Sequence, residues 1–122
     1  MNDKSVLVIE DDEFLREIYV DTLKNEGYVV EAAQDGEGGY EKIKSRAWDL
    51  VLLDIILPKL SGLEIVKKIK SEQNVPLSKK IIFLTNLDNE QQKKEALELG
   101  SGYLIKSQLT PGDLLREVNK VF

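Results

Sequence analysis

Short apolar runs alternate along this chain with segments of helical periodicity, and this alternation constrains the fold more than any other feature. The runs are continuous rather than alternately polar, as in strands that are buried on both faces of a parallel sheet. They lie at residues 6–9, 28–33, 49–54, 80–85 and 103–106. Between them, the spacing of apolar side chains predicts helices at 13–26, 37–46, from 61 onwards, 88–99 and from 110 to about 121.

Such an alternation indicates parallel strands that are joined by right-handed crossovers, with helices on both faces of the sheet. We therefore expect an α/β fold: a doubly wound, flavodoxin-like (βα)5 domain with a five-stranded parallel sheet of order 2-1-3-4-5. The 122 residues suffice for one such domain, which we expect to span residues 1–122. In this order strands one and three are neighbours, and ligands bind outside the carboxyl ends of the strands.

The expected helices carry start and stop signals at their ends. Asp12 precedes the first helix as an N-cap, and Gly27 follows it as a stop. Ser61 is followed three residues later by a glutamate, which is a capping-box pattern. Thr110 and Pro111 fit an N-cap and the first helical position. The apolar residues whose spacing of three and four indicates the first helix are Phe14, Leu15, Ile18, Tyr19 and Leu23.

The composition excludes several kinds of chemistry. The chain has no cysteine and no histidine, so disulfides, thiolate metal sites, Ser-His-Asp triads and imidazole bases are excluded. Any metal must therefore bind to oxygen ligands, which hard cations such as Mg²⁺ and Ca²⁺ prefer. The 22 acidic and 17 basic residues give a net charge of −5, which argues against direct nucleic-acid binding.

Nothing in the sequence predicts contact with a membrane. No apolar run approaches the length of about 18 residues that a membrane-spanning helix needs. The segment from Met1 to Lys4 does not open a signal peptide. We therefore expect a cytoplasmic protein.

Polar and charged side chains stand at the carboxyl ends of four predicted strands. Glu10 and Asp11 end the first strand, Asp54 the third, Thr85 the fourth and Lys106 the fifth. Because strands one and three are neighbours, three carboxylates should meet and raise one another's pKa values. A cation would relieve this repulsion, and Mg²⁺ fits a site with few oxygen ligands. Thr85 and Lys106 on the far side would leave room for a phosphoryl group between a metal and an ammonium.

Each of these residues also has an ordinary structural interpretation. Asp12, which follows the acidic pair, is better explained as a helix cap than as a ligand. Thr85 is a common strand residue, Lys106 is a common surface residue, and Asp54 could cap the turn that follows it. The functional interpretation rests on the joint pattern, because four strand ends at one edge of the sheet carry complementary chemistry.

The order and spacing of four motifs resemble those of a response-regulator receiver domain of two-component signalling, over essentially the whole chain. The first is Val-Leu-Val-Ile-Glu-Asp, which ends at Asp11. The second is Leu-Leu-Asp-Ile-Ile-Leu-Pro, which contains Asp54 and precedes Gly62 by four residues. The others are Ile-Phe-Leu-Thr, ending at Thr85, and Tyr-Leu-Ile-Lys, ending at Lys106.

The resemblance implies a role for each matching residue. Asp54 would be the phosphoacceptor, with Mg²⁺ as the cofactor. Asp11 would bind the ion directly and Glu10 through water, and the backbone carbonyl of Ile56 would be a further protein ligand. Among the remaining matches, Thr85 and Lys106 would bind phosphoryl oxygens, and Tyr103 would be the aromatic switch that turns inward when Thr85 moves.

The function implied by the resemblance is phosphorylation-activated signalling. A sensor histidine kinase or a phosphotransfer protein would donate the phosphoryl group. The face made by the fourth helix, the fifth strand and the fifth helix would then control a partner protein or an output domain. Such a chain is not an enzyme beyond catalysing its own phosphorylation and dephosphorylation.

Some positions depart from the family pattern. Ser107 stands where the family usually has proline, and Asn86 stands where a small residue is usual. The positions that flank the path of an attacking water match Ile56 and Leu87. Both are apolar and cannot orient a water, so we expect the phosphoryl group to be comparatively long-lived.

Three other classes of protein were weighed against this interpretation. A flavin-binding module would need a phosphate cradle after the first strand, where Glu10 and Asp11 would repel phosphate. A metal-dependent phosphohydrolase would need an acid or base two residues after Asp54, where Ile56 stands. The remaining alternative is a degenerate receiver that binds proteins without phosphorylation, and the intact acidic and lysine residues argue against it.

Overall fold

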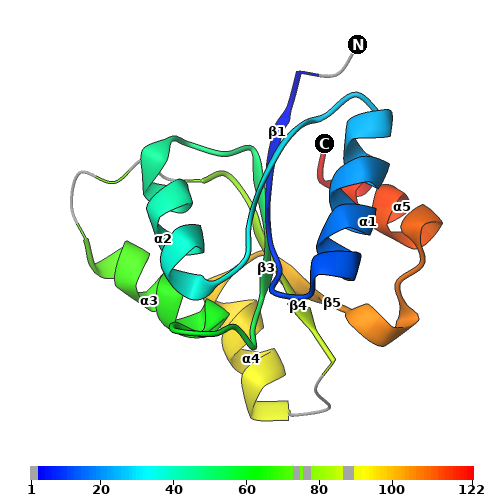
Figure 1. The fold of residues 1–122 in the computed structure, drawn as a ribbon. Coiled ribbons are helices and arrows are strands. Elements are labelled where there is room, and N and C mark those ends of the chain that lie inside the picture. Colours follow the sequence, from blue (N-terminus) through cyan, green and yellow to red (C-terminus); the bar gives the residue numbers. More distant parts are fainter. Residues whose placement is uncertain (1–2, 73–74, 76–77, 87–89) are drawn as a thin grey trace.

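The computed structural model describes residues 3–72, 75, 78–86 and 90–122. Figure 1 shows a central sheet with helices on either side of it. The strands are β1 (Ser5–Ile9), β2 (Val29–Ala33), β3 (Leu50–Asp54), β4 (Ile81–Thr85) and β5 (Gly102–Ile105). The helices are α1 (Glu13–Asn25), α2 (Gly36–Ser45), α3 (Gly62–Ser71), α4 (Glu90–Leu99) and α5 (Pro111–Val121), with a 3-10 helix at Lys106–Gln108.

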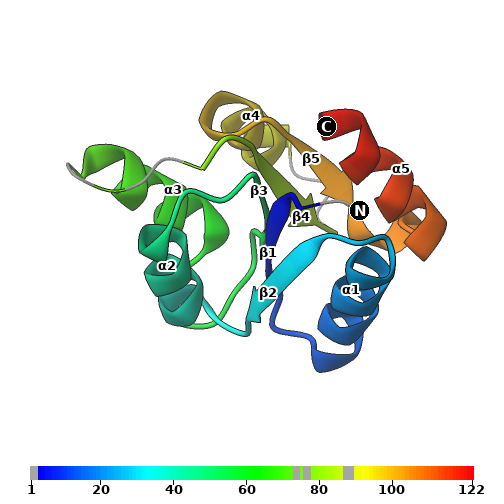
Figure 2. The same ribbon diagram turned by 90° about the horizontal axis from the view of Figure 1, so that it is seen from above.

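The sheet has the predicted topology. Its five strands lie in the order β2-β1-β3-β4-β5, and all four pairings are parallel. Seen from above in Figure 2, α1 and α5 cover one face of the sheet, and α2, α3 and α4 cover the other. The carboxyl ends of β1 and β3 are therefore neighbours at the centre of one edge of the sheet, as the sequence predicts.

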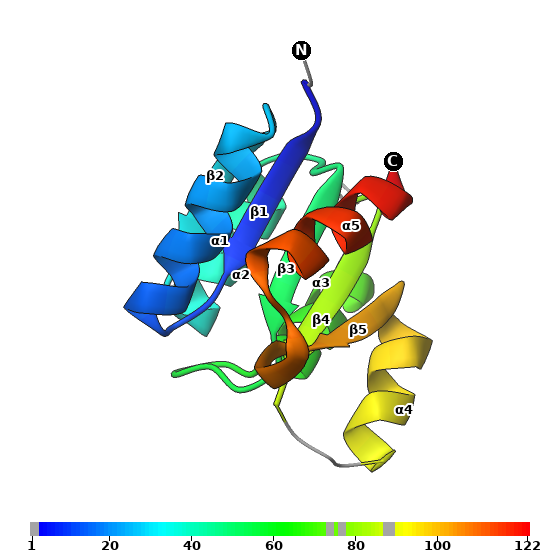
Figure 3. The same cartoon turned by 90° about the vertical axis from the view of Figure 1, so that its right-hand side faces the viewer.

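Two hydrophobic cores lie on the two faces of the sheet, because side chains alternate along each strand. In β1, Val8 packs in the core under α1 and α5, and Ile9 packs in the core under α2, α3 and α4. In β3, Leu52 and Leu53 divide in the same way. All four side chains are fully buried, and each such burial stabilises the fold by about 1.5–3 kcal/mol. Figure 3 views the molecule from the side of α1 and α5.

One of the apolar residues that indicate the first helix does not face the sheet. Tyr19 and Leu23 are buried and Leu15 is half-buried, but Phe14 is 72% exposed. Phe14 precedes Tyr19 by five residues, which places it about 140° away around the helix. The spacing correctly indicated the helix, but only the stripe with the four-residue spacing of Leu15, Tyr19 and Leu23 contacts the sheet.

The predicted helix caps are present. The Asp12 carboxylate accepts a hydrogen bond from the backbone N–H of Leu15 at 2.9 Å, and the Ser61 hydroxyl accepts one from that of Glu64 at 3.2 Å. The Thr110 side chain forms a reciprocal capping box with the third residue of α5. Each cap contributes about 1 kcal/mol and fixes where its helix begins. No helix within the described ranges is long and apolar enough to cross a membrane.

The predicted ends of the elements lie within one residue of the observed ones where the structure describes them, and one shift concerns the site. The predicted start of the fourth helix at residue 88 lies outside the described residues. The fifth strand was expected to include Lys106, but β5 ends at Ile105 and Lys106 opens the 3-10 helix. Lys106 thus lies on a tight turn just beyond the sheet. No peptide bond between described residues is cis, and the bond from Lys106 to Ser107 is therefore trans.

Gly62 fixes the loop after β3 against the sheet. A Cβ atom at Gly62 would lie 2.3 Å from the backbone oxygen of Asp54, so no larger residue fits there without a backbone shift. The Gly62 N–H donates a hydrogen bond to the carbonyl of Ile55 at 2.9 Å. The start of α3 is therefore packed directly against the backbone of Asp54.

Candidate functional site

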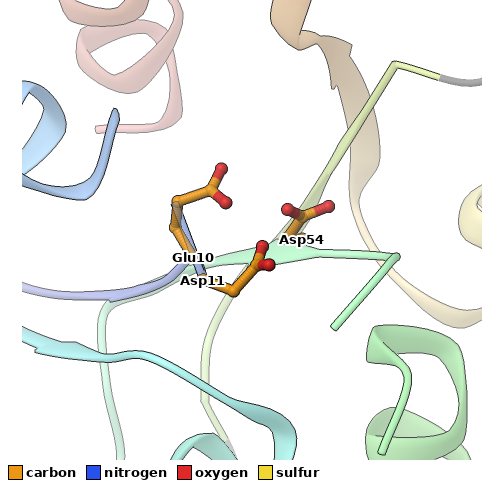
Figure 4. Close-up of side chains that lie close together, drawn as sticks. All are labelled: Glu10, Asp11 and Asp54. Atoms are coloured by element: carbon orange, nitrogen blue, oxygen red, sulfur yellow. The ribbon is translucent and has the colours of Figure 1, made fainter. Parts of the chain in front are cut away.

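Three carboxylates meet at the carboxyl edge of the sheet, as predicted from the sequence. Glu10 and Asp11 follow β1, and Asp54 is the last residue of the neighbouring β3 (Figure 4). One carboxylate oxygen from each lies within 4.8 Å of the others. All ligand atoms of the cluster are oxygens, and such a set fits a hard divalent cation such as Mg²⁺.

Lys106 lies between two of these carboxylates. Its Nζ is 2.6 Å from Glu10 Oε1 and 2.8 Å from Asp54 Oδ2, and its side chain is only 10% exposed. Burial lowers the pKa of Lys106, but hydrogen bonding to Asp54 and Glu10 outweighs it and leaves that pKa raised. The ammonium is therefore firmly charged and already neutralises part of the cluster. The sequence placed Lys106 on the far side of the site, whereas the structure places it against the carboxylates themselves.

Glu10 is the most deeply buried acid of the cluster, with no exposed surface. Its Oε2 accepts a hydrogen bond from the backbone N–H of Asp12 at 3.1 Å. Its Oε1 accepts none of regular geometry from the described residues, although Lys106 Nζ lies close to it. Burial, opposed by Lys106 and reinforced by the charge of Asp54, raises the pKa of Glu10.

Asp11 and Asp54 differ in exposure. Asp11 is exposed, and partial burial together with the neighbouring Glu10 raises its pKa, as the sequence predicts for clustered carboxylates. Asp54 is 3% exposed. Its Oδ1 accepts a hydrogen bond from the backbone N–H of Ile56 at 3.2 Å, and its Oδ2 accepts one from Lys106. Both oxygens of Asp54 are thus held in a fixed orientation.

Arg16 supports the acidic segment from α1, and the sequence analysis missed it. One guanidinium nitrogen of Arg16 donates to the backbone carbonyls of Glu10 at 2.9 Å and Asp11 at 3.3 Å. These bonds tie the turn after β1 to the first helix and fix where both acids lie. The sequence feature that could have indicated this role of Arg16 is its position in the first turns of the helix that directly follows the acidic residues.

Thr85 and Tyr103 lie on the same face of the sheet. Thr85 is the buried last residue of β4, and Tyr103 is a half-buried residue of β5. The parallel register pairs Phe83 with Tyr103 and Thr85 with Ile105. Phe83 and Tyr103 pack in the core under α2, α3 and α4, and alternation puts Thr85 on that face as well. The two predicted switch residues are therefore separated by one diagonal step of the sheet.

Of the two apolar residues expected to flank the site, the structure describes only Ile56. Ile56 follows β3 in the loop toward α3, and its side chain is 56% exposed. Leu87 lies outside the described residues. The structure thus places Ile56 at the open side of the site, next to the Asp54 carboxylate that its own N–H contacts.

Comparison with known proteins agrees with the fold. The family model of the response regulator receiver domain matches residues 6–119. The transcriptional regulatory protein DltR of Streptococcus agalactiae is 37% identical over 113 residues, which are 93% of this chain and 49% of DltR. The alkaline phosphatase synthesis transcriptional regulatory protein PhoP of Bacillus subtilis is 35% identical over 95% of this chain and 45% of PhoP.

Solved structures show the same fold. The receiver domain of the Francisella response regulator 1452 superposes with a TM-score of 0.85 at 27% identity, over 98% of this chain and 96% of that one. The chemotaxis response regulator CheY4 of Vibrio cholerae gives 0.83 at 28% identity, over 99% of this chain and all of CheY4.

The chain therefore belongs to the response regulator receiver domain family of two-component signalling. This is a family of signalling domains rather than a family of classical enzymes. The chain spans about half the length of the curated relatives it matches.

Proposed function

We propose that this receiver accepts a phosphoryl group on Asp54 in a reaction that needs Mg²⁺. The observation that carries the proposal is the placement of Asp54, which is buried, oriented by two donors and next to Glu10 and Asp11. A carboxylate held in this way can act as a nucleophile without reorganising, which is what phosphoryl transfer asks of a protein.

In the transfer step an oxygen of the Asp54 carboxylate attacks the phosphorus atom of the donor. An acyl-phosphate P–O bond forms while the bond from phosphorus to the donor breaks, and the donor's leaving group keeps that electron pair. Lys106 and Thr85 bind the oxygens of the transferred group. The Lys106 ammonium lies 2.8 Å from Asp54 Oδ2, so it needs only a short movement to follow the new charge.

The residues that would hold the ion are the side chains of Glu10, Asp11 and Asp54 and the backbone carbonyl of Ile56. When bound, Mg²⁺ offsets the negative charge of the carboxylates and of the phosphoryl oxygens. The cluster fits this role because its acids crowd one another: burial and mutual repulsion raise the pKa values of Glu10 and Asp11.

The signal would leave through the face made by α4, β5 and α5. Phosphorylation adds about 1.5–2 negative charges to the site, which attract Thr85 and Lys106. Thr85 and Tyr103 share one face of β4 and β5, so movement of Thr85 opens space toward which Tyr103 can turn. The partners are a sensor histidine kinase or phosphotransfer protein as the donor, and a target protein or output domain as the receiver of the signal.

The test is intact-mass spectrometry of the chain after incubation with acetyl phosphate and Mg²⁺. We expect one added phosphoryl group, which is absent in Asp54→Asn and absent with a chelator. Asp12→Asn is the matched control, because it removes a neighbouring carboxylate but keeps a residue that can cap α1. Equal labelling of Asp54→Asn would refute the assignment. A wild-type chain that stays unlabelled would favour the receiver that acts only as a protein-binding scaffold.

A further inference from the structure

The loop between β3 and α3 is held by α2 as well as by the sheet (Figure 1). Gly36 is the buried first residue of α2, and its backbone N–H donates a hydrogen bond to the carbonyl of Pro58 at 3.0 Å. The first N–H groups of a helix have no acceptor within the helix, so this one is available to the loop. The amino end of α2 is therefore bonded to the loop that leaves Asp54, although neither Gly36 nor Pro58 takes part in the proposed phosphoryl transfer.

The backbones of α2 and of this loop are in direct contact at Gly36. A Cβ atom at Gly36 would lie 2.0 Å from the backbone oxygen of Leu60 and 2.7 Å from its carbonyl carbon. Carbon atoms in favourable contact are about 3.5–4 Å apart. Because the colliding atoms of Leu60 belong to the backbone, no side-chain rotation makes room for a larger residue. Any side chain at position 36 would therefore move the loop or the helix.

This contact supports a strained turn. The Leu60 N–H donates to the same Pro58 carbonyl at 2.9 Å, and Lys59 between them has a φ of 74°. A hydrogen bond across three residues around a positive φ defines a γ-turn of the rare, strained kind. Lys59 is also the one non-glycine residue with a positive φ in the described part of the chain. Strained backbone persists where the surrounding structure imposes it, and here the contact with Gly36 does so.

The turn lies close to the groups that this loop contributes to the site. The Ile56 N–H donates to Asp54 Oδ1 at 3.2 Å, and the Ile56 carbonyl is the backbone ligand of the proposed metal site. A single residue separates Ile56 from Pro58, so a shift at Pro58 displaces Ile56 as well. Mg²⁺ demands near-ideal octahedral geometry with ligands at about 2.0–2.1 Å, so displacement of one ligand lowers its affinity.

We propose that Gly36 is a positioning residue for the metal site, because its contact with Pro58 and Leu60 fixes the loop that presents the Ile56 carbonyl to Mg²⁺. The proposal rests on the proposed function, in which that carbonyl is a ligand. It assigns a role to the amino end of α2, which itself contributes no group to the site. The strained turn at Lys59 is the part of the loop through which α2 acts.

The first experiment compares Gly36→Ala with wild type by calorimetric titration with Mg²⁺. The added Cβ displaces the loop at Leu60, so the affinity for Mg²⁺ should fall about 10-fold, as is typical when a group that orients a metal ligand is lost. An unchanged affinity in a folded Gly36→Ala would overturn the proposal. If Gly36→Ala does not fold, the variants of Lys59 described below decide.

Gly100→Ala is the matched control. A Cβ atom at Gly100 would lie 2.8 Å from the backbone oxygen of Ile81 and 2.9 Å from the ring of Phe83. Ile81 begins β4, so this collision lies at the amino end of the sheet, opposite the acidic cluster. Both variants should lower the urea midpoint, but Gly100→Ala should leave the affinity for Mg²⁺ unchanged. An equal loss of affinity in both would show that it follows from stability alone, and would overturn the proposal.

The second experiment changes the turn itself and compares two variants of one exposed residue. The Lys59 side chain is 55% exposed, and its Nζ lies 3.8 Å from Asp35 and 3.7 Å from Glu37. Lys59→Gly adopts a positive φ without strain, whereas the β-branched side chain of Lys59→Val strongly disfavours it. We expect Lys59→Val to bind Mg²⁺ about 10-fold more weakly than wild type and Lys59→Gly to bind it equally well. An equal loss in both would assign the effect to the missing ammonium, and would overturn the proposal.

The proposed phosphorylation is decided separately, because the affinity for Mg²⁺ is measured without a phosphoryl donor. Equal affinities in wild type, Gly36→Ala and Lys59→Val would overturn the role of α2 even if acetyl phosphate labels Asp54 normally. A wild type that binds no Mg²⁺ would overturn that role as well.

Discussion

Carboxylates at the two ends of the sheet have pKa values that are shifted in opposite directions. At the amino end, Asp49 accepts hydrogen bonds from the backbone N–H of Ser5 at 2.8 Å and from its hydroxyl at 3.2 Å. Lys79 Nζ lies 3.1 Å from its other oxygen. The backbone hydrogen bond from Ser5, aided by Lys79, lowers the pKa of Asp49. At the carboxyl end, burial raises the pKa values of Glu10 and Asp11.

The difference separates an acid whose charge the fold stabilises from acids whose charge the fold opposes. Asp49 has donors for both oxygens and ties β1 to the start of β3, so the fold gains from its charge. Burial and mutual repulsion raise the pKa values of Glu10 and Asp11, so the fold opposes the charged form of these two acids. The proposed function accounts for this cluster by the cation that it would bind, and the following four comparisons test the difference between the two ends.

The largest expected effect concerns the two lysines. Lys106→Met should slow phosphoryl labelling about 100-fold, because it removes a buried charge that stabilises the transferred group. Lys79→Met should leave the labelling rate unchanged and alter the free energy of unfolding by less than about 1 kcal/mol, since its side chain is 69% exposed. Time courses of labelling by intact mass measure both. Equal labelling rates in the two variants would contradict the proposal that only the carboxyl end of the sheet takes part in phosphoryl transfer.

The next effect is that removing Asp49 and removing Asp11 should change the free energy of unfolding in different directions. Without metal, Asp49→Ala should lose about 2–3 kcal/mol of unfolding free energy, because the hydrogen bonds from Ser5 lose a charged acceptor. Asp11→Ala should unfold at the same or a higher urea concentration than wild type, because it relieves repulsion with Glu10. Urea denaturation in the presence of a chelator provides the comparison. A comparable loss in Asp11→Ala would show that Asp11 is structural.

A smaller effect is the pH dependence of stability without metal. The pKa of Glu10 is raised from 4.5, so the wild type should lose stability as the pH rises above 4.5 through the folded-state value. The pKa of Asp49 is lowered from 3.8, so its contribution is present above 3.8 and is lost as the pH falls further. Glu10→Gln should reduce the loss of stability with rising pH, of which the raised pKa of Asp11 leaves a part, and Asp49→Asn should remove only the loss at lower pH. Urea midpoints across the pH range test the two slopes separately.

The smallest expected effect concerns two exposed phenylalanines at opposite ends. Phe122 contacts the ring of Tyr28 at a centroid distance of 5.6 Å, so Phe122→Ala should cost about 0.5–1 kcal/mol. Phe14 is 72% exposed at the start of α1, and Phe14→Ala should change stability by less than about 0.5 kcal/mol. Thermal melting of the two variants ranks them, and the reverse order would contradict the packing described here.

Most of the fold could be predicted from the sequence because parallel strands that are buried on both faces need continuous apolar runs. The predicted runs match the five strands within two residues, and the observed order is that of the flavodoxin-like fold, which this alternation of strands and helices indicates. The meeting of Glu10, Asp11 and Asp54 was also predictable, since residues at the ends of adjacent parallel strands share one edge. The roles of these residues in phosphorylation stay predictions.

The remaining features depend on side-chain geometry that periodicity does not describe. The position of Lys106 follows from a 3-10 turn that begins one residue beyond β5. The contacts of Arg16 depend on the path of the chain between β1 and α1. Phe14 and Tyr19 both fit a loose helical spacing, but they lie about 140° apart around α1, and the structure shows which of the two sides faces the sheet.

The position of β1 in the sheet has a consequence for synthesis of the chain on the ribosome. All five residues of Ser5–Ile9 are buried, between β2 on one side and β3 on the other. At roughly 5–20 residues per second, translation produces β1 seconds before β3. During that interval Ser5–Ile9 is an uncharged, β-branched segment without its cover, a kind of sequence that promotes aggregation. Until Leu50–Asp54 has been made, Ser5–Ile9 therefore lacks one of the two strands that cover it in the folded domain.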